Sequence, residues 1–231
     1  MFGSKPRALA LMLMLIAPPA LLAHTIAGED ANYVQTIDGP AIAPFMYLGA
    51  KHMVTGFDHL LYLFAVIFLL NRPLQVLQFV SLFALGHSIT LLAGVLFNLQ
   101  VNPYLIDAVI GFSIVYKAFE NMDGFASLTR WRPNAKLAVF VFGLFHGLGL
   151  ATKLQAFDLS QNGLVVNILS FNVGVEIGQL FALSALLLTL ALWKTSGNNA
   201  PHRFTVNSLL MVGGFLLSFY QLSAYYLGSP Y

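Results

Sequence analysis

Apolar residues occur along this chain in long runs, separated by short polar or proline-containing stretches. Six of these runs are long enough to form α-helices that cross about 30 Å of hydrocarbon at about 1.5 Å per residue. Runs of this length exclude barrel strands, so the sequence predicts an all-α, polytopic transmembrane helical bundle. The predicted spans are 47–70, 74–97, 103–121, 136–152, 163–193 and 205–227.

The N-terminal segment has the features of a secretory signal peptide. Lys5 and Arg7 precede a short apolar stretch that contains two prolines, and small residues lead up to Ala23. We predict a signal peptide over residues 1–23, with an uncleaved anchor helix as the alternative. Residues 24–46 then form an extracytoplasmic segment, 47–227 the six-span domain, and 228–231 an extracytoplasmic tail.

Basic residues are concentrated in the predicted loops on one side of the membrane. The loops predicted on the cytoplasmic side carry six of them, whereas the opposite side carries only Lys51 and Lys153. This agrees with the positive-inside rule and places the mature N-terminus and the C-terminus outside the cytoplasm. The six are Arg72, Arg130, Arg132, Lys136, Lys194 and Arg203.

Composition narrows the class of protein and the chemistry. The chain is 58% hydrophobic and 9% charged, with a mean hydropathy of +0.77. A soluble domain carries about 25% charged residues, so the sequence is that of an integral membrane protein. The net charge of +2 comes from scattered residues, which gives no basis for a nucleic-acid partner. Cysteine is absent, so any metal must be bound by nitrogen and oxygen.

Ionisable residues stand near the middle of four predicted spans. They are Asp58 and His59 in the first, His87 in the second, His146 in the fourth and Glu176 in the fifth. Such groups are costly in hydrocarbon and turn toward partners or water, so we expect these five to meet at one level. Histidine and carboxylate without thiolate suit Ni²⁺, Co²⁺, Zn²⁺ or Cu²⁺. The alternative is a structural polar network that links helices.

Further polar residues extend this predicted site. His52 lies seven residues before His59 on the same helix face, where it could line an access route, and Asp58 points about 100° away from His59, toward a supporting partner. Asn172 and Gln179 share a face with Glu176 and give the fifth span a polar stripe. Helix association is the alternative role for that stripe.

Glycines near the predicted site allow close helix packing. Gly143 and Gly147 flank His146, and glycines at this spacing allow helix backbones to approach closely.

A second set of polar residues lies on the third span. Ser113, Lys117 and Glu120 share a face there, and Asp107 lies near the outer end. For Lys117 and Glu120 an ion pair at the membrane boundary is a sufficient explanation.

The ordered blocks TGFDHLLYLFAVI, FALGHSITL, IGFSIVYKAFEN, VFGLFHGLGLA and FNVGVEIGQL resemble the HupE/UreJ family of bacterial membrane proteins. The resemblance covers most of residues 47–225. It implies a permease that takes up nickel or cobalt across the bacterial inner membrane. It also implies that His59, Asp58, His87, His146 and Glu176 bind the ion.

Two classes of function follow from these residues. The first is a secondary transporter of a divalent metal, with ligands at the midplane of the bilayer. The second is an intramembrane zinc-dependent hydrolase in which the same histidines hold zinc and a carboxylate activates water. A third hypothesis concerns His24, which cleavage after Ala23 would make the N-terminal residue, able to chelate copper through its amine and imidazole.

Overall fold

The computed structural model describes residues 33–70, 72–157, 159–194 and 200–228. The predicted signal peptide and His24 lie outside these residues. Within them the chain is helical and contains no strand. The helices are α3 (Ile42–Thr55), α4 (Phe57–Ile67), α5 (Pro73–Leu96), α6 (Pro103–Asn121), α7 (Gly124–Thr129), α8 (Ala135–Gln155), α9 (Leu164–Lys194) and α10 (Ala200–Leu227).

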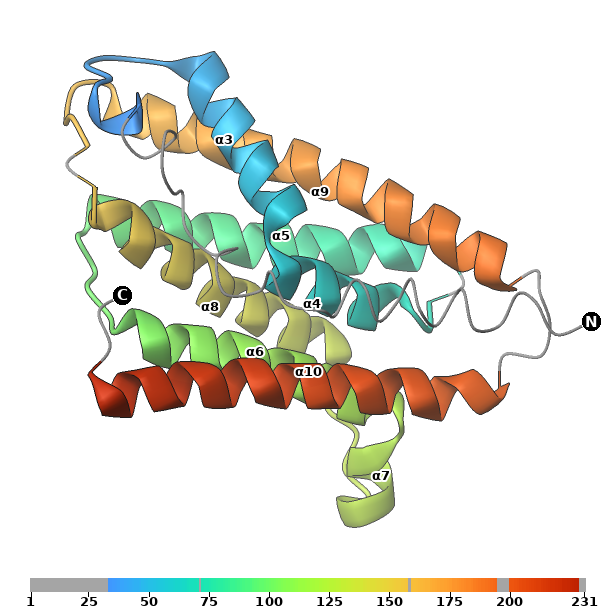
Figure 1. Cartoon of the computed structure of the whole chain (residues 1–231). Coiled ribbons are helices and arrows are strands. Elements are labelled where there is room, and N and C mark those ends of the chain that lie inside the picture. The colour runs from blue at the N-terminus through green and yellow to red at the C-terminus, as the bar shows by residue number, and fades with distance from the viewer. Residues whose placement is uncertain (1–32, 71, 158, 195–199, 229–231) are drawn as a thin grey trace, which may run out of the picture.

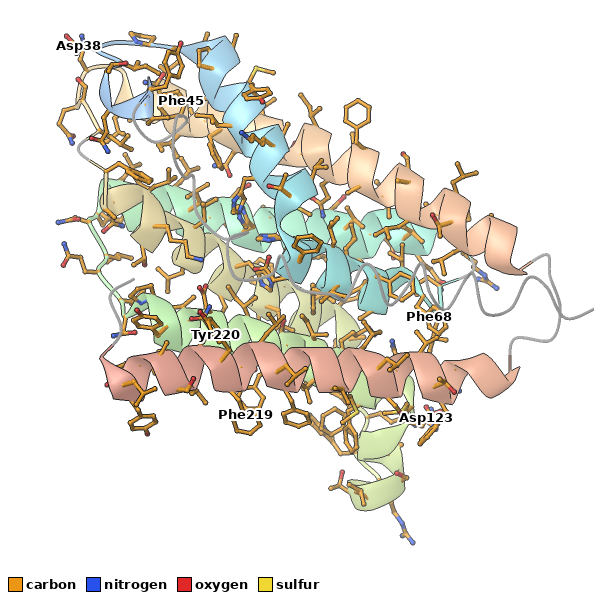
Figure 2. All side chains as sticks on the ribbon, in the orientation of Figure 1. Asp38, Phe45, Phe68, Asp123, Phe219 and Tyr220 are labelled. Carbon is orange, nitrogen blue, oxygen red and sulfur yellow. The ribbon has the colours of Figure 1, made fainter. Side chains whose placement is uncertain are left out.

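The predicted all-helical membrane bundle is confirmed, whereas the prediction of six spans is not confirmed. Four helices in the described part of the chain are long and apolar enough to cross a membrane: Pro73–Leu96, Ala135–Gln155, Leu164–Ala191 and Arg203–Leu227. α6 begins and ends at the predicted residues, but it is not one of these four helices, since it carries Asp107, Lys117 and Glu120. Large apolar side chains cover the outer surface. One is Phe219, 60% exposed, which projects away from the bundle (Figure 2).

The first predicted span, 47–70, is wrong as a single helix. The chain forms α3 and α4 instead, with a break at Gly56, whose φ of −73° and ψ of 101° are extended. Glycine has little preference for a helix, and here it also has a steric role. A Cβ at this position would lie 2.8 Å from Nδ1 of His59 and 3.2 Å from Oδ1 of Asp58. The break therefore leaves space for these two side chains in the first turn of α4.

Three tightly packed helix pairs form the bundle: α3 with α9, α5 with α8, and α6 with α10 (Figure 1). Glycines lie at all three contacts. A Cβ at Gly147 of α8 would collide with the His87 carbonyl of α5, and one at Gly174 of α9 would collide with the Met46 carbonyl of α3. Ser218 of α10 donates to the Ala108 carbonyl of α6 at 3.0 Å. These close approaches confirm the predicted role of the glycines.

α4 lies between the pairs and is fixed at its C-terminal end by a polar network. Asn121 Nδ2 donates to the Ala65 carbonyl at 2.7 Å and to Oδ1 of Asn207 at 3.0 Å. Arg203 Nε donates to the Asn121 carbonyl at 2.7 Å, and Arg203 also pairs with Asp123. This end of the bundle, which contains the loop between α6 and α8, is called the α6–α8 end, and the opposite one the α5–α6 end (Figure 1).

Candidate metal site

Four imidazoles from four helices meet, with His59 at their centre. His52 lies in the last turn of α3, His59 in the first turn of α4, His87 halfway along α5 and His146 on α8. The ring centre of His59 is 5.0 Å from that of His52, 5.1 Å from that of His146 and 6.1 Å from that of His87. The structure thus brings together the three histidines predicted to meet. It also adds His52, which the sequence placed on an access route. We call these four residues the histidine cluster.

These spacings can be compared with the size of a metal site. A metal–nitrogen bond of about 2.0–2.1 Å places an imidazole centre about 3.2 Å from the ion, so two imidazoles at a tetrahedral angle have centres about 5 Å apart. Two of the three distances from His59 are close to this value. As the side chains stand, no three His, Asp or Glu residues in the described part of the chain form a group that could hold a metal ion. Binding therefore requires the rings to reorient.

Hydrogen bonds donated by Nδ1 orient the rings of His59 and His146. Oδ1 of Asp58 lies 3.0 Å from Nδ1 of His59, and the Phe142 carbonyl lies 2.7 Å from Nδ1 of His146. Both partners accept, so each neutral imidazole carries its proton on Nδ1 and its lone pair on Nε2. A carboxylate in this position also holds the ring in one orientation. Asp58 was expected to point away from His59. In the first turn of α4 it instead contacts that ring directly.

Several buried polar atoms of the cluster make no hydrogen bond within the described residues. They are Nε2 of His52, Nε2 of His59, both ring nitrogens of His87, and the hydroxyl of the neighbouring Tyr62. A buried polar atom without a partner costs about 1–3 kcal/mol. These four nitrogens belong to three rings, and one imidazole binds an ion through one nitrogen, so they offer three donors of the kind that transition-metal ions prefer. The chemistry of these residues suits a metal ion, although the rings would have to reorient to bind it.

A small cavity adjoins the cluster. It is lined by His59, Tyr62 and Gln179 together with apolar residues of α3, α4, α5 and α8, and its volume is about 10 Å³. That is about the volume that one water molecule needs. The ring of Tyr62 packs 5.4 Å from those of Phe83 and His146. Tyr62 was not predicted, although its position three residues after His59 places it on the same helix face.

The polar stripe of α9 separates into buried and exposed parts. Gln179 is 2% exposed and donates to the Val80 carbonyl at 3.4 Å, and Asn172 is 6% exposed. Glu176 is exposed, so the structure does not bury it with the histidines as the sequence predicted. The physical reason is helical geometry. Glu176 lies about 60° around α9 from Gln179, just outside the face that packs against the other helices.

The second polar set forms two ion pairs. Lys117 lies 2.9 Å from Glu120, as predicted. Lys153 was predicted in a loop, which is wrong, because α8 continues to Gln155 and Lys153 is only 9% exposed. Its Nζ lies 3.1 and 3.0 Å from the two carboxylate oxygens of Asp107 on α6. The helical bundle therefore contains a buried ion pair between helices that the sequence did not reveal.

Comparison with known proteins connects this arrangement to a family. The sequence model described as HupE / UreJ protein matches residues 28–229, which is nearly the whole chain. No curated protein and no solved structure matches the chain significantly. The match includes every member of the histidine cluster and the helices that carry them. This membrane protein therefore belongs to the HupE/UreJ family.

Proposed function

We propose that this protein is a permease for a divalent transition-metal ion, nickel or cobalt, and that the histidine cluster binds the ion during passage. The single observation that carries the proposal is the meeting of imidazoles from α3, α4, α5 and α8 around His59 in an otherwise apolar interior. Membership of the HupE/UreJ family is consistent with this role. Asp58 contributes by orienting His59, and Glu176 is not part of the proposed site.

The break between α3 and α4 supports transport in particular. Many secondary transporters bind their substrate where a membrane helix is interrupted, near the middle of the bilayer. Here the interruption at Gly56 directly precedes Asp58 and His59. The first turn of a helix also has unsatisfied backbone N–H groups, which favour the Asp58 carboxylate there. The interruption at Gly56 thus supports the proposal that Asp58 and His59 act together at a metal site within the membrane.

The basic residues support an orientation for the proposed permease. α4, α6 and α9 end at the α6–α8 end (Figure 1), and most of the basic residues that flank helices come soon after these three helices in the sequence. By the positive-inside rule we place this end in the cytoplasm and the α5–α6 end outside it. An ion taken up by the cell would then travel from the α5–α6 end through the histidine cluster.

Reconstitution into liposomes tests the proposed function. We would measure entry of Ni²⁺, Co²⁺, Zn²⁺ and Cu²⁺ for the wild type and for His59→Ala and His87→Ala, with metal analysis of the same preparations. Lys117→Gln is the matched control, because it removes a buried polar side chain that is not in the cluster. We expect flux in the wild type and the control, and none in the two histidine variants. One tightly retained zinc per chain without flux would indicate the hydrolase instead.

A further inference from the structure

A buried ion pair lies between the histidine cluster and the α5–α6 end. Lys153 on α8 contacts both carboxylate oxygens of Asp107 on α6, at 3.1 and 3.0 Å, and both side chains are nearly inaccessible, 8% and 2% exposed. Gln221 of α10 also reaches this carboxylate, with Nε2 3.4 Å from Oδ2. Three helices therefore converge on one negative charge.

This pair is aligned with the proposed site. Lys153 follows His146 by seven residues, so both lie on the same face of α8, two turns or about 10 Å apart. Gly149, between them, faces Asp107: a Cβ there would lie 3.8 Å from Oδ1 of Asp107. The pair therefore lies between His146 and the α5–α6 end of the bundle.

The chemistry of the Asp107–Lys153 pair requires a cation beside the carboxylate. A buried ion pair adds little stability relative to apolar side chains, but a buried charge without a partner is costly. Lysine holds a carboxylate as a point charge on a flexible chain, whereas arginine would form a rigid two-point contact. The carboxylate and the amide oxygen of Gln221 are hard donors of the kind that a hydrated divalent cation binds weakly and releases.

We propose that Asp107 is a transient binding station for the metal ion on the extracytoplasmic side of the histidine cluster, with the Lys153 ammonium as its resident counter-ion. The ammonium occupies the carboxylate until an incoming divalent cation displaces it. When the ion moves on to the cluster, Lys153 returns to Asp107 and repels a second cation. This inference rests on the proposed function and specifies how the ion reaches the histidines.

The test uses the full-length chain in proteoliposomes and Ni²⁺ as the probe. The main variant is Asp107→Asn with Lys153→Met, which removes both charges and nearly preserves the shapes of the side chains. The matched control is Lys117→Met with Glu120→Gln, which neutralises the other ion pair of α6. The initial rate of Ni²⁺ uptake is measured over a range of external concentrations, equilibrium Ni²⁺ binding is measured in detergent, and thermal unfolding reports on the fold.

Loss of the station should reduce uptake at low Ni²⁺ concentration about tenfold, since the carboxylate no longer attracts the cation. The maximal rate, equilibrium binding at the cluster and the control variant should stay unchanged. If uptake by Asp107→Asn with Lys153→Met depends on Ni²⁺ concentration as in the wild type, the binding station is refuted, whereas the proposed permease function is not. No flux and no Ni²⁺ binding in the wild type would overturn both.

A second variant decides the question if the neutral pair does not fold. Lys153→Arg retains the ion pair but makes the cation harder to displace, because a guanidinium binds a carboxylate at two points. We expect slower uptake at every Ni²⁺ concentration with an unchanged melting temperature. Wild-type uptake in Lys153→Arg would overturn the station, since a purely structural pair tolerates either cation.

Discussion

Replacing Asp58 with asparagine tests how the histidine cluster binds its ion. The two side chains have nearly the same shape, and the carbonyl oxygen of the new amide can still accept the hydrogen bond that Asp58 Oδ1 receives from Nδ1 of His59 at 3.0 Å. The substitution therefore preserves the orientation of the ring and the position of its proton. What it removes is the negative charge, which would stabilise a cation bound to His59.

The expected size of the effect follows from the hydrogen bond and its burial. A hydrogen bond to a charged group contributes about 1.5–3 kcal/mol and one between neutral groups about 0.5–1.5 kcal/mol. Asp58 is only 2% exposed, so little water replaces the lost interaction. The difference of about 1–1.5 kcal/mol corresponds to about tenfold weaker metal binding. This lies at the lower end of the range of about 10–100-fold found when a carboxylate behind a metal-bound histidine is removed.

Isothermal titration of the purified protein with Ni²⁺ and with Co²⁺ measures the effect. The matched control is Asp38→Asn, which removes the charge of an exposed carboxylate that accepts a hydrogen bond from Ser160 at 2.7 Å. We expect weaker binding in Asp58→Asn and unchanged binding in the control, with the same melting temperature for both. An unchanged affinity in folded Asp58→Asn would refute the reasoning, because His59 would then not be a ligand that Asp58 supports.

Two further predictions concern the packing that positions the cluster. Gly147→Ala should destabilise the protein by about 1–3 kcal/mol and weaken Ni²⁺ binding, because the new Cβ collides with the backbone of His87. Gly213→Ala is the control, because a Cβ there meets nothing within 4 Å and should not destabilise the protein. Thermal unfolding compares the melting temperatures of the two variants. Asn121→Ala should lower stability by about 1–3 kcal/mol, since the buried Ala65 carbonyl loses its donor. An unchanged melting temperature would contradict either prediction.

The sequence predicts α5 and α6 well because both helices begin at local signals. Pro73 and Pro103 stand in the first turns of α5 and α6, where a missing N–H has no cost, and Asn102 caps α6 through its side chain. The break between α3 and α4 follows a different rule. Residues 47–70 are apolar throughout most of their length, so their hydropathy does not reveal the extended backbone at Gly56. A Cβ at Gly56 would crowd the side chains of Asp58 and His59, and average hydropathy does not contain such contacts between near neighbours in the chain.

The candidate site divides in the same way between predictable and unpredictable residues. His87 and His146 could be predicted because a buried ionisable group in a membrane helix faces inward. Position along the helix could not show that Gln179 is buried and Glu176 exposed, because both lie near the middle of α9 and differ mainly in their angle around its axis. Lys153 was misplaced for a related reason. A charged residue near the end of an apolar run resembles a loop residue until its partner, Asp107, is found on another helix.

The proposed ligands are divided among helix pairs that are tightly packed internally but make few contacts with one another. His52 belongs to the α3/α9 pair, His87 and His146 belong to the α5/α8 pair, and His59 lies on α4 between them. Within each pair glycines hold the backbones in close contact, whereas α9 makes few contacts with α4 or α5. A movement of the α3/α9 pair as a rigid body would therefore separate His52 from His87 and His146 without unpacking either pair. Rocking of one unit against another around a central site is how many transporters expose it to alternate sides. A catalytic zinc site would instead need all its ligands held on one rigid unit.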